Sequence, residues 1–343
     1  MDTTWREIVR PYAQPHLGRS ILDIATSVVP YLGLMVAMYL ALDVSYWLVL
    51  ALSVPAAGFL LRTYILFHDC THGSFLPGKR ANAVAGIFCG LVAFSDFYGW
   101  RHSHAVHHAT AGDLERRGTG DVPTMTVAEY HAAPWGQRLM YRTMRSPWIL
   151  FTIGPIYSLI IQPRMVSKDA RPRIKRSVRL TNLALVVLVG GLCLLIGWQE
   201  FLAIQAPAAL LAGSAGVFMF YVQHQFEDVY WESSDNWDFA EAGLRGSSFL
   251  DLPRVLHFFT GNIGYHHVHH LSARIPNYNL PRAHRENPEL FKDVPTLSLW
   301  DGLRTMRLKL WDEDRGRLVT WAEGRESVAA RAGGRGAAAP ASS

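Results

Sequence analysis

Four stretches of the chain are apolar over about 20 residues each, and they dominate its pattern of hydrophobic and polar positions. An α-helix rises 1.5 Å per residue, so about 20 apolar residues cross the roughly 30 Å hydrocarbon core of a bilayer. The pattern predicts membrane-spanning helices at about 21–42, 45–67, 178–197 and 201–223. Only "LDVS" separates the first two and "GWQE" the last two, so each pair is expected to form a tight helical hairpin.

Two weaker apolar stretches, at about 83–98 and 147–162, are shorter and are interrupted by Gly, Pro or Asp96. They are predicted to be interfacial or shallowly re-entrant helices rather than further spans. Residues 1–324 are expected to form one domain. The remaining segment, 325–343, is rich in Ala, Gly and Ser and is expected to be a disordered tail.

Composition supports membrane residence. Hydrophobic residues make up 50% of the 343 residues and charged residues 18%, below the roughly 25% typical of soluble domains. Eleven Trp and thirteen Tyr suit membrane–water interfaces, where amphipathic rings gather. The net charge of +5 fits basic loops, since no nucleic-acid motif accompanies it. The fold class predicted is an all-α integral membrane protein, with four spans in two hairpins, interfacial helices and a helical cytoplasmic cap.

Charge also predicts the orientation. The segment between His68 and Val178 is rich in Lys and Arg, whereas the two short hairpin loops contain neither. By the positive-inside rule this segment, both termini and everything after about residue 223 are expected to be cytoplasmic. Three cysteines without CxxC spacing argue against a disulfide framework. The first 20 residues lack the features of a secretory signal.

The chemistry-bearing residues are histidines, fifteen in all. Three groups stand out, "HDCTH" at 68–72, "HSHAVHH" at 102–108 and "HHVHH" at 266–270, and one further histidine ends the fourth span. Residues four apart share one face of a helix, and neutral imidazole is the commonest side-chain metal ligand. The predicted ligands are the nine patterned histidines: His68, His72, His104, His107, His108, His224, His266, His269 and His270. One structural zinc takes four ligands, so nine imidazoles predict two metal ions.

The other histidines receive weaker interpretations. Ordinary surface or core roles are expected for His16, His131, His257 and His284. His102 and His267 fall outside the repeated pattern and are expected to be supporting or incidental.

Two charged residues near the first group are also interpreted. Asp69 faces away from the His68–His72 face of a helix, so it is expected to accept a hydrogen bond from a ring N–H. Arg62, six residues before His68, is expected to extend toward the interface without a catalytic role.

These motifs resemble the membrane-bound fatty acid desaturases, histidine-box enzymes that use two irons and O₂. The resemblance covers about residues 45–285. It includes "WRHSHAVHHATAGDLER" at 100–116, "VQHQFEDVYWESSDNWDF" at 222–239 and "HHVHHLSARIPNYNLPRA" at 266–283, which are similar to acyl-lipid Δ12/ω-6 members. It implies that the nine histidines bind two iron ions. It also implies that an acyl chain, O₂, two electrons and two protons give a cis double bond and two waters.

The resemblance also implies a separate electron donor of the ferredoxin or cytochrome b5 type, because no HPGG haem motif occurs in the chain. Phe220 stands where acyl-CoA members carry a metal-associated Asn, which favours a lipid-bound substrate. Two alternatives remain open at this stage. One is a carotenoid ketolase or hydroxylase of the same histidine-box group. The other is a membrane metal transporter, although transporters place polar ligands near the bilayer midplane and these histidines lie at or beyond the span ends.

Overall fold

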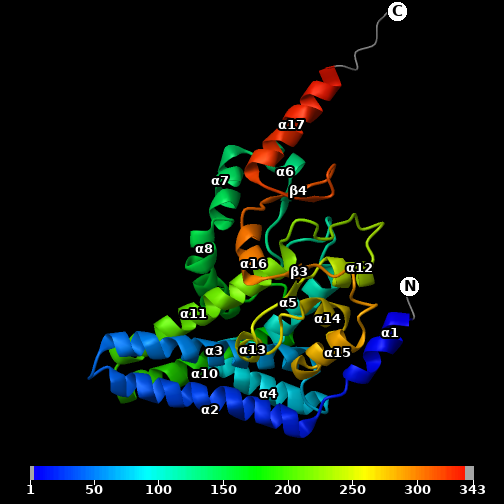
Figure 1. Cartoon of the computed structure of the whole chain (residues 1–343). Coiled ribbons are helices and arrows are strands. Elements are labelled where there is room, and N and C mark those ends of the chain that lie inside the picture. The colour runs from blue at the N-terminus through cyan, green and yellow to red at the C-terminus, as the bar shows by residue number, and fades with distance from the viewer. Residues whose placement is uncertain (1–3, 337–343) are drawn as a thin grey trace, which may run out of the picture.

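The computed structural model describes residues 4–336. Four long helices form its base and lie side by side in Figure 1. All four are long and apolar enough to cross a membrane: α2 (Leu17–Ala41), α3 (Tyr46–His72), α10 (Pro172–Ile196) and α11 (Trp198–His224). The four predicted spans and their pairing into two hairpins are confirmed, as is the all-α membrane class.

Two of these helices run further than hydropathy alone predicts. α3 continues five residues past the predicted end, to His72, and stops where Gly73 adopts a left-handed conformation with φ of 73°. Such a conformation is easy only for glycine. α11 likewise ends on His224. Both helices therefore present histidines on their last turns, at the same end of the bundle.

The segment predicted at 83–98 is a sharply bent pair of helices, α4 (Lys79–Val92) and α5 (Phe97–Thr110). The two helices turn through 101°. Asp96 begins the second helix, because its carboxylate accepts a hydrogen bond from the Gly99 amide. The bend directs α5, with the second histidine group, toward the end of α3.

The segment predicted at 147–162 is a series of short helical pieces packed beside α11. The pieces are α8 (Pro147–Phe151), α9 (Ile153–Pro155), the π-helix η2 (Ile156–Ile161) and η3 (Gln162–Arg164). None is long enough to cross a bilayer. The interfacial location of this segment stays a prediction.

The cap consists of short helices and two small sheets. Before the broken segment come β1 (Met125–Thr126), α6 (Val127–Ala132) and α7 (Trp135–Met144). After α11 come α12 (Phe239–Arg245), β2 (Phe249–Leu250), α13 (Arg254–Phe259), α14 (His266–Leu271), η4 (Asn277–Asn279), α15 (Leu280–Glu286), β3 (Thr296–Leu297), α16 (Leu299–Thr305), β4 (Leu310–Asp312), β5 (Arg317–Val319) and α17 (Trp321–Gly336). The chain starts with α1 (Thr4–Val9) and η1 (Arg10–Tyr12).

The sheets join distant parts of the chain. β4 pairs in parallel with β1 and antiparallel with β5, and β2 pairs in parallel with β3. The loop after α5 is thereby tied to the segment after α16.

The expected tail is helical where the structure describes it. α17 runs from Trp321 to Gly336 and extends away from the bundle in Figure 1. Thr320 donates its backbone N–H to Glu323, and Ser327 donates its hydroxyl to Asp312. These contacts anchor a helix that Ala-rich sequence already favours. The structure thus places residues 325–336 in a helix where disorder was expected, and 337–343 lie outside the described residues.

Arg62 does not extend to the interface as expected. Its side chain is buried in the bundle, where Nη2 lies 2.8 Å from Asp23 Oδ1. Nε donates to Ser27 Oγ at 2.9 Å and Nη1 donates to the Phe258 carbonyl. A guanidinium away from water is stabilised by a carboxylate partner and further acceptors. The Arg62 side chain therefore pairs with Asp23 of α2 inside the bundle and does not reach the membrane interface.

Candidate metal centre

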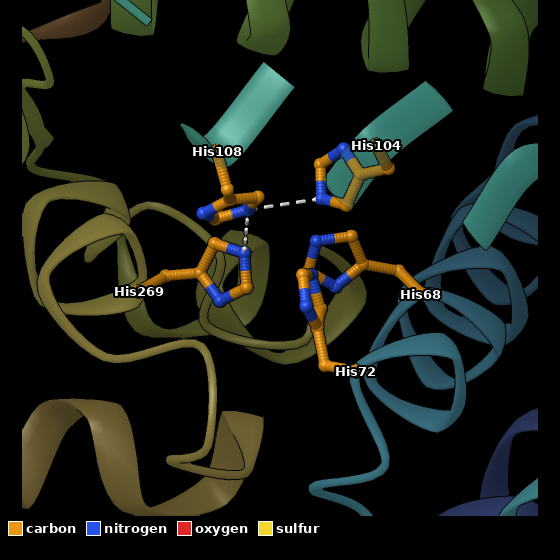
Figure 2. A group of neighbouring side chains, drawn as sticks. All are labelled: His68, His72, His104, His108 and His269. Carbon is orange, nitrogen blue, oxygen red and sulfur yellow. Dashed lines mark hydrogen bonds between the residues drawn. The ribbon is translucent and has the colours of Figure 1, made fainter. Parts of the chain in front are cut away.

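Five histidines from three segments form the first cluster (Figure 2). His68 and His72 come from α3, His104 and His108 from α5, and His269 from α14. One ring nitrogen from each lies within 4.8 Å of the others. His108 Nε2 is 3.1 Å from His104 Nε2 and 3.0 Å from His269 Nε2. The i, i+4 pairs that the sequence indicated thus face one another across helices.

Three further histidines, His107, His224 and His270, form a second cluster beside the first. His107 Nε2 lies 3.3 Å from His224 Nε2. His266 joins it, with its Nε2 2.9 Å from His224 Nε2. The ring centroids of His108 and His270 are 4.2 Å apart, so the two clusters adjoin. The structure brings all nine predicted histidines together.

The surroundings of three α14 histidines favour the neutral imidazole. Burial lowers the pKa of His266, His269 and His270 well below the ordinary value. Neighbouring imidazoles lower these pKa values further, because one positive ring disfavours another. Neutral imidazole has a free lone pair, so these rings are in the protonation state that binds metal at neutral pH.

Acceptors behind three rings set their tautomers. His68 Nδ1 lies 3.0 Å from Asp69 Oδ1, the contact expected if Asp69 accepts from a ring N–H. His107 Nδ1 lies 2.6 Å from Asp121 Oδ1, and His224 Nδ1 lies 3.1 Å from the Gly246 carbonyl. A carboxylate or carbonyl oxygen at Nδ1 favours the tautomer in which Nδ1 donates and the Nε2 lone pair is free to bind a metal.

Asp121 was missed by sequence reasoning. It lies 14 residues after His107, across a loop whose Gly120 has a φ of 78°. A Cβ at Gly120 would lie 3.1 Å from His107 Cβ, so the glycine permits the loop to approach α5. The "GTGD" run marks a turn, but it does not indicate which side chain the turn approaches.

A second missed contact lies behind His224. Gln225 Oε1 accepts a hydrogen bond of 2.7 Å from Arg145 Nη2, and Gln225 Nε2 donates to the His224 carbonyl at 3.0 Å. The Arg145 side chain is fully buried and also donates to the Pro123 and Leu308 carbonyls. The end of α11 is therefore fixed by a residue 80 positions earlier in the chain.

The remaining histidines lie outside both clusters. His102 is exposed on α5, and His16 caps α2 by accepting a hydrogen bond from the Arg19 amide. His267 is buried, but its Nε2 pairs with His284 Nδ1 at 2.9 Å. His257 stacks on Tyr265, and His131 packs against Tyr130. Their expected supporting or ordinary roles agree with these positions.

The residues present fit metal ions. Within the described part of the chain, His72 Nε2 and His270 Nε2 are buried without a hydrogen-bond partner. Orphaned buried nitrogens are costly unless something binds them. The clusters contain imidazole nitrogens only, a donor set suited to iron, zinc, copper or nickel. A cavity of about 20 Å³ beside His107 and His224 has room for one water-sized molecule.

Fold and site together define a polytopic helical membrane protein with two adjoining all-histidine clusters that could hold metal ions. A model of the family "Fatty acid desaturase" matches residues 45–299. A fatty acid desaturase of Bacillus subtilis is 48% identical over 313 residues, covering 91% of this chain and 89% of the relative. The chain therefore belongs to the fatty acid desaturase family, whose members are oxidoreductases.

More distant relatives have more specific names. An sn-1 oleoyl-lipid 12-desaturase of Synechocystis is 27% identical over 287 residues, covering 82% of this chain and 81% of the relative. An sn-1 acyl-lipid omega-3 desaturase (ferredoxin) of the same organism is 27% identical over 236 residues, covering 64% and 62%. The family predicted from the motifs is confirmed.

Proposed function

We propose that this protein inserts a cis double bond at the Δ12 position of a membrane-lipid acyl chain, using O₂ and two iron ions held by the nine histidines. The observation that carries the proposal is the meeting of nine histidines, six of them buried and three partly buried, at the end of four membrane-spanning helices, in a member of the desaturase family. The 27% identity to an oleoyl-lipid 12-desaturase supports the position and the lipid carrier.

The reaction consumes an acyl chain, O₂, two electrons and two protons, and it releases the unsaturated chain and two waters. Removing hydrogen from an unactivated carbon is beyond side-chain acids and bases, and redox-active iron supplies that chemistry when bound, whereas zinc has no redox chemistry. His68, His72, His104, His108 and His269 would hold one ion. His107, His224, His266 and His270 would hold the other.

The protein orients these ligands before any ion binds. Asp69, Asp121 and the Gly246 carbonyl keep protons on the outer nitrogens of three rings, so the inner nitrogens remain free. Burial excludes water from the cluster, which protects a strong oxidant from side reactions.

Phe220 supports a lipid-bound rather than a thioester substrate. Its ring lies 5.3 Å from the His107 ring and 5.2 Å from the His224 ring. An apolar ring there leaves no polar group to assist the second ion. Phe220 therefore departs from the acyl-CoA members, which carry an Asn at the corresponding position.

The electrons would come from a separate protein of the ferredoxin or cytochrome b5 type. A relative whose name specifies ferredoxin supports the first type. The metal centre lies at the cap end of the spans, so a soluble donor can approach it from the cap side.

Lipid analysis tests the proposal. The chain would be expressed in a host that makes only monounsaturated fatty acids, with a compatible ferredoxin, beside His270→Ala and the exposed control His102→Ala. We expect a diene with its new bond at Δ12 from the wild type and His102→Ala, and none from His270→Ala. A new bond elsewhere would reject the Δ12 assignment. No new bond, despite two bound irons, would reject acyl desaturation and favour a carotenoid substrate.

A further inference from the structure

Exposed tryptophans gather at two levels of the molecule. Trp47 and Trp198 are 81% and 61% exposed, and they start α3 and α11 beside the hairpin loops. Trp135, Trp148 and Trp300 are 73%, 82% and 68% exposed, and they lie on α7, α8 and α16. Exposed indoles are costly in water but favourable at a membrane interface, where tryptophans form belts at both surfaces.

The two levels are separated by about the thickness of a bilayer. α8 contacts α11 where Ser214 Oγ donates to the Phe151 carbonyl, and the Phe151 and Phe218 rings pack together. Gly302 of α16 lies against Phe218 and Val222. Phe218 follows Trp198 by 20 residues, or about 30 Å of helix, which equals the hydrocarbon core. With Trp198 at one boundary, α8 and α16 lie at the other.

α7 presents a largely apolar side away from the protein core, on which Gly136 and Thr143 lie between the apolar side chains. Tyr141 and Arg145 lie on its buried side. On the opposite side, four exposed side chains share one face: Trp135, Leu139, Met140 and Met144. Figure 1 shows α7 and α8 running across the direction of the long helices. A one-sided apolar helix in this orientation lies flat on a membrane.

Basic residues flank the apolar face. Arg138 and Arg142 lie along one edge of α7, between its apolar and buried sides. Arginines at the edge of an interfacial helix are attracted to anionic headgroups. Along the same helix runs a groove of about 730 Å³ that includes Met140 and Met144 in its lining, so the groove borders the same surface.

We propose that α7, α8 and α16 form a collar that rests in the headgroup boundary of a bilayer containing anionic phospholipid. We define the collar by six exposed side chains: Trp135, Leu139, Met140, Met144, Trp148 and Trp300. It continues the apolar surface of the spans, since α8 and α16 both pack on α11. The collar fixes the height of the cap above the membrane, and therefore the depth at which an acyl chain meets the histidine clusters.

A fluorescent label on the collar tests this placement. Leu139→Cys and Trp300→Cys would each be made in the full chain with Cys193→Ser, since Cys70 and Cys89 are buried and unreactive. The control is Glu326→Cys on α17, an exposed residue of a helix that extends away from the bundle. Each variant is labelled with an environment-sensitive dye and reconstituted singly in nanodiscs. The discs contain phosphatidylcholine and spin-labelled lipid, with or without phosphatidylglycerol.

We expect spin-labelled lipid to quench the dyes at 139 and 300 several-fold more than the dye at 326. Phosphatidylglycerol should increase the quenching at 139. Equal quenching at all three positions would overturn the collar, and no effect of phosphatidylglycerol would overturn its preference for anionic lipid. If the dye at position 139 is shielded from water only in discs that hold two copies of the chain, the apolar side of α7 would bind a second copy instead of lipid.

Discussion

The carboxylate of Asp121 determines which nitrogen of His107 faces the second histidine cluster. Its oxygen lies 2.6 Å from His107 Nδ1 and can accept a hydrogen bond from that nitrogen. Without it the ring can rotate or shift its proton to the inner nitrogen. Outer partners of metal-binding histidines are typically worth about 10–100-fold in metal affinity or activity.

Asp121→Ala should therefore lower iron retention and desaturation by about 10–100-fold. Asp121→Asn should retain more of both, because an amide oxygen can still accept from Nδ1. Iron per protein would be measured after competition with a chelator, and new double bonds by gas chromatography. Asp228→Ala, at an exposed carboxylate on the loop after α11, is the control. Equal iron loss in the two alanine variants would contradict the positioning role.

Lys309 is a second residue whose environment has a measurable consequence. Burial, and then the positive charge of Arg145, lower its pKa to about 8. Below pH 8 the amine is charged in both the folded and the unfolded state. The folded state then carries the full free-energy cost of a buried charge. Between pH 8 and about 10.5 the folded state has released the proton and the unfolded state has not, so the penalty declines. The contribution of Lys309 to the free energy of unfolding therefore rises with pH between about pH 8 and about pH 10.5.

Lys309→Met should stabilise the protein at pH 7 by up to about 3 kcal/mol. The lost hydrogen bond from Nζ to the Arg145 carbonyl offsets part of the gain. The advantage should disappear by about pH 10.5, and thermal unfolding in detergent at pH 7 and pH 10 would show it. Lys79→Met, at an exposed lysine, should change little at either pH. A gain for Lys309→Met that is the same at both values would rule out the buried charge as its cause.

Spacing within single helices made eight of the nine histidines predictable, and His224 followed from its place at the end of the fourth span. His68 and His72, or His104 and His108, share a helical face whatever the rest of the fold does. Asp121, Gln225 and Arg145 could not be found in this way. Their contacts join loops and helices far apart in sequence. The spacing of residues within one segment gives no information about such contacts. Arg62 shows the same limit, because its partner Asp23 lies on another helix.

At the scale of elements, the bend between α4 and α5 depends on a close approach to α3. A Cβ on Gly86 would meet the Phe97 ring and would lie 2.9 Å from Cys70 Cβ. Phe97 begins α5 and Cys70 lies between His68 and His72. Gly86 therefore allows the helices that carry the first two histidine groups to pack together.

Gly86→Ala should destabilise the protein by about 1–3 kcal/mol, because overpacking forces Phe97 or α3 to move. Gly190→Ala is the matched control, since a Cβ there meets no atom within 4 Å. Thermal unfolding midpoints would be compared with iron content. We expect both to fall for Gly86→Ala and neither for Gly190→Ala. An unchanged midpoint for Gly86→Ala would mean that the contact relaxes without cost.

The long apolar helices were predictable because a run of about 20 apolar residues can cross a bilayer only with its backbone hydrogen bonds satisfied, as in an α-helix. Short elements were not. Residues 325–336 have a disordered-looking composition, but the contacts of Glu323 and Ser327 anchor the helix that contains them. The small sheets are also invisible to periodicity, since β1 and β2 have only two residues each and pair with strands far along the chain.

At the scale of the whole molecule, both hairpin loops lie at one end of the bundle and the histidine clusters and cap at the other. The loops contain no Lys or Arg, and the segment that joins the hairpins contains many. By the positive-inside rule, loops rich in Lys and Arg stay on the cytoplasmic side. The cap is therefore predicted to be cytoplasmic. A cytoplasmic cap would also give the metal centre access to soluble reductants.

Labelling of intact cells decides this orientation. Asp43→Cys lies in the first hairpin loop and Glu326→Cys lies on α17, and both positions are exposed. With Cys193→Ser in the background, a membrane-impermeant maleimide should label residue 43 in intact cells. It should label residue 326 only after the membrane is opened, because the charged reagent cannot cross lipid. Labelling of 326 but not 43 in intact cells would invert the protein in the membrane. The electron donor would then have to act outside the cytoplasm, and ferredoxin would be excluded as its partner.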